Sequence, residues 1–273
     1  MNKSLEKRES LYMEEWIKKL FVERADIFLK LLNERWARTE ELVNGMLKVL
    51  GSFGVSSGNL LDLCCGNGRI SVYMAKKGFK TVGVDISRAF IEDANKKAKE
   101  HKVSDKTRFV EGDVRRLKEI LKEVSEPFDV IVNAWTSIGY FPQEEELNIF
   151  KQARELSKEG AILFIAETAH TEFFSIKFTP TSYSEIDNFV ILENRSYDPK
   201  TAQLNTTWSF YKKHGNNLKF IDKVDFQLHI YSLNELVGLL EKAGWETIAY
   251  YGSLMNLQPM NPLTSLNVIA KAI

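Results

Sequence analysis

The stretch that decides the fold reads LLDLCCGNGR and occupies residues 60–69. An apolar run ends in an acidic residue and a turn with two glycines, and a helical pattern follows. A second apolar strand spans residues 79–84 and ends at Asp85. Glycines let a ligand approach the backbone closely, and an acid at the end of the second strand can accept hydrogen bonds from two ribose hydroxyls. The pattern indicates a parallel α/β sheet with a nucleoside-binding edge.

Strands and helices alternate from residue 59 onward, which predicts an α/β fold with a doubly wound, mostly parallel sheet. Apolar runs predict strands at 59–64, 79–84, 106–111, 128–133 and 161–167, and helical spacing predicts helices at 68–77, 87–100, 114–124 and 143–157. Ser87 stands where it can cap a helix, and Pro142 suits the start of the helix at Gln143. The last strands, 245–251 and 266–273, form a closing pair after a helix at 232–243.

The remaining segments flank or interrupt this core. Apolar residues recur at helical spacing between residues 10 and 50, so we expect helices there. Residues 168–188 look irregular, whereas 189–197, 202–213 and 217–231 predict three antiparallel strands joined by turn residues. The predicted organisation is therefore an N-terminal helical cap (1–58), a core (59–167 and 232–273) and an antiparallel insertion (168–231).

Composition limits the function classes. The 37 basic and 37 acidic residues of this 273-residue chain balance, which disfavours a nucleic-acid partner. The only cysteines, Cys64 and Cys65, are adjacent and rarely bridge each other, so we expect reduced, buried packing residues and no metal site. A charged N-terminus and the lack of an apolar run of about 20 residues predict a cytoplasmic protein without a membrane partner.

Four motifs in order resemble those of the class I S-adenosylmethionine-dependent methyltransferases. They are DLCCGNG (62–68), VGVDIS (82–87), EGDV (111–114) and FDVIVN (128–133). The resemblance extends from residue 59 to about 160 and includes the closing strand pair. It implies a seven-stranded Rossmann-like sheet, S-adenosyl-L-methionine as cofactor, and methyl transfer as the activity.

The resemblance also implies roles for individual residues. Asp85 would hold the two ribose hydroxyls, Asp113 would accept the adenine amino group, and the N–H of Val114 would donate to the adenine ring. Ile86 would lie against the adenine face. The other expected cofactor contacts are Asp62, Cys64, Gly66, Gly68, Asn133 and Trp135.

The segment SIGY (137–140) resembles one found in small-molecule N-methyltransferases, whereas Ala134-Trp135 replaces the proline pair of base-amine methylating enzymes. The resemblance thus predicts a small-molecule acceptor with a nitrogen or oxygen nucleophile, covered by the insertion. Tyr140 and His170 are candidates to orient or deprotonate it. Further candidates are His229 for proton transfer, Trp208 and Tyr211 for the pocket wall, and Tyr12, Trp36 and Arg38 for the cofactor.

The sequence also leaves different functions open. A dinucleotide-binding oxidoreductase would use the glycine turn, with Ser71 at its third small position, but it needs neither Asp62 ahead of the glycines nor an acid at the third strand end. An RNA or protein methyltransferase and a non-catalytic cofactor-binding module remain open as well. The insertion can instead serve a homodimer interface, because exposed strand edges invite pairing. The sequence does not identify the acceptor.

Overall fold

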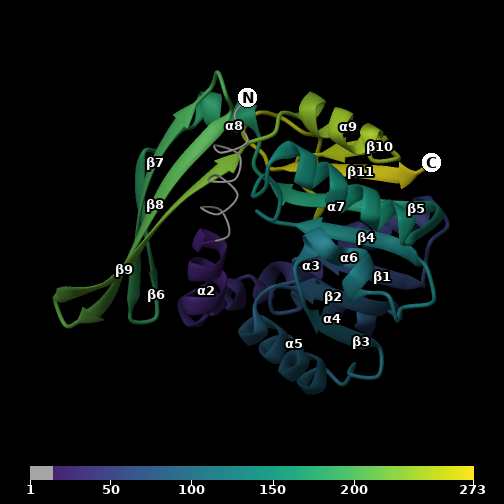
Figure 1. Cartoon of the computed structure of the whole chain (residues 1–273), viewed down its shortest axis with the longest axis horizontal. Helices are drawn as coiled ribbons and strands as arrows, with labels where there is room; N and C mark the ends of the chain where they lie inside the picture. Colours follow the sequence, from purple (N-terminus) through teal and green to yellow (C-terminus); the bar gives the residue numbers. More distant parts are fainter. Residues whose placement is uncertain (1–14) are drawn as a thin grey trace.

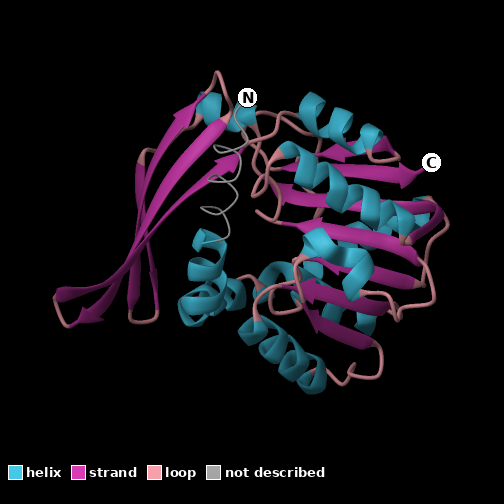
Figure 2. Ribbon diagram, viewed as in Figure 1, coloured by secondary structure: helices cyan, strands magenta, loops and turns pink. Residues whose placement is uncertain are grey.

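Two β-sheets organise the chain in a computed structural model that describes residues 15–273 (Figures 1 and 2). The larger sheet has seven strands in the order β10-β11-β5-β4-β1-β2-β3. The five strands from β1 to β5 pair in parallel, and β10 and β11 add an antiparallel edge. Their bounds are β1 Asn59–Leu63, β2 Lys80–Asp85, β3 Thr107–Glu111, β4 Phe128–Ala134, β5 Ser157–Thr168, β10 Trp245–Tyr251 and β11 Leu266–Ala272. The predicted Rossmann-like α/β fold is confirmed.

Helices cover both faces of this sheet because successive side chains of each strand point to opposite faces. Leu60 and Val130 pack with the helices α3 (Trp36–Ser52) and α4 (Arg69–Lys76). Their neighbours Leu61 and Ile131 pack instead with α7 (Gln143–Glu155) and α9 (Leu233–Lys242). α5 (Arg88–Glu100) lies beside β3 at the other end of the sheet (Figure 1).

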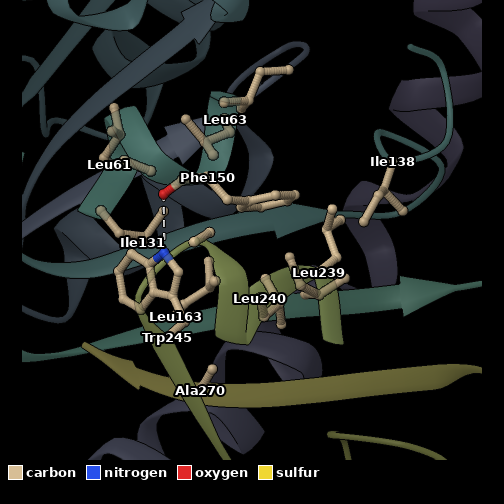
Figure 3. Close-up of a cluster of buried hydrophobic side chains, with 14 of the residues drawn as sticks. Leu61, Leu63, Ile131, Ile138, Phe150, Leu163, Leu239, Leu240, Trp245 and Ala270 are labelled. Atoms are coloured by element: carbon tan, nitrogen blue, oxygen red, sulfur yellow. Dashed lines mark hydrogen bonds between the residues drawn. The ribbon is translucent and has the colours of Figure 1, made fainter. Parts of the chain in front are cut away.

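Trp245 fixes the packing of the α7 and α9 face. Its side chain is fully buried, and its indole Nε1 donates a hydrogen bond to the carbonyl oxygen of Phe150, at 3.0 Å (Figure 3). Leu163 and Leu240 surround it from the sheet and from α9. The hydrogen bond satisfies the one polar atom of this large side chain, as burial requires.

The predicted helix at 114–124 was too long. The structure has a 3-10 turn, η2 (Val114–Arg116), followed by the short helix α6 (Leu117–Ile120). The side chain of Gln152 on α7 explains the interruption, because it donates to the carbonyl oxygen of Arg115 at 2.8 Å and accepts from the N–H of Lys118 at 3.2 Å. These backbone groups therefore need no longer helix to satisfy them.

The insertion has four antiparallel strands, not three. They are β6 (Thr181–Ile186), β7 (Phe189–Asp198), β8 (Gln203–His214) and β9 (Asn217–His229), in that spatial order. Residues 168–188, which we expected to be irregular, also contain the short helix α8 (Thr171–Ile176). β6 is not apparent in the sequence because it is a polar edge strand, and only Ile186 among its residues is buried.

The N-terminal helices lie between this second sheet and the core (Figure 1). η1 (Lys19–Glu23, a π-helical turn), α2 (Ala25–Glu34) and α3 account for most of the predicted helical region, whereas residues 10–14 lie outside the described residues. Phe28 of α2 stacks on Phe90 of α5 and on Trp208 of β8. No helix in residues 15–273 is long and apolar enough to cross a membrane.

Candidate functional site

Two adjoining cavities open where the central strands end. The first, here called the rim cavity, is lined by the turns after β1, β2, β3 and β4 and holds about 830 Å³ with its mouth included. The second, here called the aromatic cavity, lies between the core and the β6–β9 sheet. Both are lined by the side chains of Phe21, Phe28, Trp135, Thr136 and Tyr140. Molecules bound in the two cavities would therefore lie side by side.

Asp85 joins the turns that follow β1 and β2. One carboxylate oxygen accepts the N–H of Gly66 at 2.8 Å, and the other accepts the N–H of Ser87 at 2.9 Å. Each oxygen retains a lone pair for a ligand in the rim cavity, which Asp85 lines. Burial raises the pKa of Asp85 to about 6, although the hydrogen bonds from these turns lower it in part. Ser87 is the N-cap residue of α5 as predicted, but its hydroxyl makes no capping hydrogen bond.

Asp62 lies at the same edge and is also nearly fully buried. It accepts a hydrogen bond from the hydroxyl of Ser71 at 2.7 Å, and burial raises its pKa to about 6. Gly66 lines the rim cavity, whereas Gly68 does not. Gly68 has φ +72°, and a Cβ there would lie 2.7 Å from the ring of Phe109. It therefore shapes the turn and the packing behind the cavity.

Asp113 and Val114, after β3, and Ile86, after β2, also line the rim cavity. Nε of Arg115 donates to both carboxylate oxygens of Asp113, at 3.1 and 2.9 Å. Burial alone would raise the pKa of Asp113, but the hydrogen bonds and charge of Arg115 hold it below its usual value. Asp113 is thus a charged acceptor at neutral pH, and Arg115 fixes its orientation. We did not predict Arg115, although it follows the EGDV motif by one residue.

Three residues at the carboxyl ends of neighbouring strands have positive φ although they are not glycine. They are Cys64 after β1 (φ 54°), Trp135 after β4 (φ 66°) and Glu167 in β5 (φ 56°). Each such conformation costs about 1–3 kcal/mol, and these costs concentrate at functional sites. Cys64 and Trp135 line the rim cavity. Burial raises the pKa of the Cys64 thiol, which therefore stays protonated.

Tyr140 stands between the two cavities. Its hydroxyl lies 3.1 Å from that of Thr136, and burial raises its pKa above the usual value. A phenol held protonated in this way orients a ligand better than it removes a proton. Buried Glu146 shapes the loop, because one of its oxygens accepts from the N–H groups of Gly139, Tyr140 and Phe141. The helical pattern of α7 gave no signal that Glu146 points inward.

The structure does not bring every predicted residue to a cavity. Both ring nitrogens of the fully buried His170 are engaged, with Glu172 and with the carbonyl oxygen of Thr264, each at 2.8 Å, and His170 lines neither cavity. Asn133 also lines neither and donates to the carbonyl oxygen of Ser137 at 3.2 Å. Of the further candidates, Trp208 and His229 line the aromatic cavity, Trp36, Arg38 and Tyr211 line neither cavity, and Tyr12 lies outside the described residues.

Known proteins are similar to this chain over the strands whose ends line the rim cavity. Residues 60–160 match a family described as a methyltransferase domain. A putative methyltransferase, YqeM of Bacillus subtilis, is 31% identical over 127 residues, which cover 46% of this chain and 47% of that protein. A tRNA (uracil(54)-C(5))-methyltransferase of Pyrococcus horikoshii is 27% identical over 187 residues, 67% of this chain and 41% of that protein. The chain thus spans about half the length of these curated relatives.

Solved structures share the fold over nearly the whole chain. An S-adenosylmethionine-dependent methyltransferase from Clostridium acetobutylicum has a TM-score of 0.74 at 16% identity, covering 92% of this chain and 98% of that one. The sugar N-methyltransferase KedS8 from a Streptoalloteichus species has a TM-score of 0.66 at 15% identity, covering 91% and 92%. At these identities the likeness shows the fold, including the additional sheet.

Proposed function

We propose that this chain, which carries a class I S-adenosylmethionine-dependent methyltransferase domain, methylates a nitrogen or oxygen of a small molecule held in the aromatic cavity. The resemblance predicted from the four motifs is confirmed by the matching domain at residues 60–160. The observation that carries the acceptor proposal is the shared wall, in which Trp135, Thr136 and Tyr140 line both cavities. A small molecule there would lie next to a cofactor in the rim cavity.

The rim cavity fits S-adenosyl-L-methionine chemically. Asp85 keeps lone pairs for two ribose hydroxyls, and Asp113 with Val114 suits the adenine edge. Aromatic faces of Phe21 and Tyr140 suit a sulfonium cation. The amino-acid arm of the cofactor would lie against Asp62, Cys64, Gly66 and Arg69, and its adenine would lie against Ile86. When bound, the cofactor supplies an electrophilic methyl carbon.

The chain itself would position the acceptor and exclude water. The phenol of Tyr140 and the hydroxyl of Thr136 lie at the boundary of the cavities and can hold the acceptor for in-line attack. Burial lowers the pKa of His229, so its imidazole is neutral at pH 7 and can take the proton that the acceptor loses. The insertion at 168–231 and the N-terminal helices would act as covers that keep the site dry.

The charge of the aromatic cavity supports a small molecule over RNA. Among the described residues that line it, Arg195 is the only lysine or arginine, and Glu193 lies beside it at 3.7 Å. Proteins that bind RNA rely on several cations facing the phosphates. The aromatic cavity next to the rim cavity favours an enzyme with an acceptor site over a module that binds the cofactor alone.

Methyl transfer with a labelled cofactor tests the proposal. The protein is incubated with methyl-labelled S-adenosyl-L-methionine and, separately, with a panel of small amines and phenols, with total RNA and with a mixture of proteins. We expect label in at least one small molecule and none in RNA or protein. Label only in RNA or protein would overturn the small-molecule proposal, and cofactor binding without any transfer would favour the binding module.

A further inference from the structure

The aromatic cavity contains buried hydrogen-bonding atoms that have no partner. Among the described residues, five side chains that line it each have such an atom. The atoms are Nε1 of Trp16, Nε of Arg195, Oγ1 of Thr206, Nε1 of Trp208 and the phenol oxygen of Tyr231. Buried polar atoms are nearly always hydrogen-bonded in native proteins, so five together in one cavity are groups that a bound ligand could satisfy. The three nitrogens can only donate.

Three of these atoms belong to one patch on the inner face of the β6–β9 sheet. In the strand register Arg195 pairs with Thr206, and Glu193 pairs with Trp208. Directly paired residues and residues two apart along a strand share a face. Arg195, Thr206 and Trp208 are therefore neighbours on the side that lines the aromatic cavity.

The remaining walls are flat and apolar. Trp16 stacks on Phe226 with 5.1 Å between ring centroids and 21° between planes, and Trp208 meets Phe226 edge-on at 5.5 Å. Tyr140 meets Trp16 edge-on from the core side, at 5.2 Å. A flat conjugated ring fits such walls by stacking.

Charge separates the possible occupants. A nucleotide-activated sugar carries a diphosphate, which needs cations or several N–H donors from one helix end. The described lining has the single cation of Arg195, which Glu193 partly neutralises. A neutral molecule rich in oxygen acceptors can accept hydrogen bonds from the unpartnered donors and needs no further cations.

We infer that the methyl acceptor is a flat conjugated ring compound with several carbonyl, ether or hydroxyl oxygens, not a nucleotide-activated sugar. The inference rests on the proposed function, because it assigns the aromatic cavity to the acceptor. The rings would lie face-on to Trp16 or Phe226, whose planes are nearly parallel, and edge-on to Trp208. The oxygens would accept hydrogen bonds from the patch formed by Arg195, Thr206 and Trp208.

Calorimetry on the full chain, saturated with S-adenosylhomocysteine, tests the inference with two probes. The probes are quercetin, a hydroxylated flavone, and thymidine diphosphate glucose. We expect quercetin to bind and the nucleotide sugar not to bind. Thr206→Val and Trp208→Phe should each weaken quercetin binding by about three- to tenfold, since each removes one hydrogen bond to the ligand.

Thr207 provides a matched control, because it neighbours Thr206 on the opposite face and bonds Asp225 there. Thr207→Val should leave quercetin binding unchanged. Thr206→Val should not lower the melting temperature of the ligand-free protein, because the deleted hydroxyl has no partner in it.

Each other outcome has a distinct meaning. Binding of the nucleotide sugar without quercetin, or quercetin binding that both variants leave unchanged, would overturn the inference and leave the proposed function standing. Failure of S-adenosylhomocysteine itself to bind would instead overturn the proposed function.

Discussion

The buried carboxylate of Glu146 accepts a hydrogen bond from the backbone N–H of Gly139 at 2.8 Å. The same oxygen also accepts from Tyr140 at 3.1 Å and from Phe141 at 3.3 Å. One side chain of α7 therefore fixes the loop that separates the rim cavity from the aromatic cavity. The position of Tyr140 between the cavities depends on this contact.

Glu146→Ala should lower the free energy of unfolding by about 2–4 kcal/mol, because it leaves the N–H groups of the loop without their acceptor. Glu146→Gln is the matched control, since its amide oxygen can still accept and should preserve most of the stability. Urea denaturation of both variants measures the difference. Equal losses in the two variants would contradict the role of the acceptor oxygen.

The same glutamate predicts a pH effect. Burial raises the pKa of Glu146 to about 7, against the hydrogen bonds from the loop. Between its ordinary value and pH 7 the folded state binds more protons than the unfolded state, so this group's contribution to stability falls as pH rises. The stability of wild type relative to Glu146→Gln should therefore decrease from pH 5 to pH 8. A difference that does not vary with pH would refute the prediction.

A second contact ties the loop to the insertion. The carbonyl oxygen of Gly139 accepts the N–H of His229 at 2.9 Å, and a Cβ on Gly139 would lie 2.1 Å from the carbonyl oxygen of His229. Gly139 also has φ +86°. Gly139→Ala should therefore push β9 away from the core and weaken acceptor binding far more than cofactor binding, as calorimetry with each ligand will measure.

Gly215→Ala is the control for Gly139→Ala. Both substitutions place alanine at a positive φ, but only Gly139→Ala adds a steric contact. Gly215 lies in the turn between β8 and β9 with φ +59°, and a Cβ on it would meet nothing within 4 Å. Gly215→Ala should cost about 1–2 kcal/mol of stability from its conformation alone and leave ligand binding unchanged. A binding loss as large as that of Gly139→Ala would show that the steric contact is not the cause.

The parts of the site that the sequence predicted depend on local backbone geometry. Asp85 ends β2 and Gly66 belongs to the turn after β1, and the turn residues themselves mark those positions. The strand ends then meet at one edge because the sheet is parallel. For the same reason Asp113 and Val114, after β3, could be placed at the rim from their position alone.

Contacts between distant segments could not be predicted in this way. The inward orientation of Glu146 depends on a loop conformation that no helical periodicity describes. Arg195 looks like one polar residue in an alternating strand, and its place in the aromatic cavity follows from how the second sheet faces the core. The contact of His170 with the carbonyl oxygen of Thr264 likewise joins segments that lie far apart in the sequence.

Asp85 should control cofactor affinity. Asp85→Ala should weaken binding of S-adenosylhomocysteine by about ten- to a hundredfold, since it removes the charged acceptor for two hydroxyls. Because the pKa of Asp85 is raised to about 6, wild-type affinity should fall as pH drops below 6 and the carboxylate becomes neutral. Calorimetry between pH 5 and pH 8 measures both effects.

The control for Asp85 is Glu111, the last residue of β3, which pairs with Asp85 in the register but is exposed and does not line the rim cavity. Glu111→Ala should leave affinity and its pH dependence unchanged. If Asp85→Ala bound S-adenosylhomocysteine as tightly as Glu111→Ala does, the assignment of the ribose site to Asp85 would be wrong.

The guanidinium of Arg35 lies over the indole ring of Trp135, 3.8 Å from the ring centroid. Arg35 connects α2 to α3, so this cation–π contact joins the N-terminal helices to the loop after β4. Such contacts contribute about 0.5–2 kcal/mol, depending on burial. Arg35→Ala should therefore speed the release of S-adenosylhomocysteine by about two- to thirtyfold, because the helices open more readily over the rim cavity.

Arg38 serves as the control for Arg35, because it lies one turn further along, in α3, and lines neither cavity. Its guanidinium makes a long contact of 3.7 Å to the sulfur of Met255. Arg38→Ala should leave the release rate unchanged, as measured by stopped-flow tryptophan fluorescence. Arg35→Lys tests the geometry of the contact. Its ammonium lacks the flat face that stacks on the indole, so its release rate should lie between those of wild type and Arg35→Ala. Equal release rates in Arg35→Ala and wild type would show that the helices do not retain the cofactor through this contact.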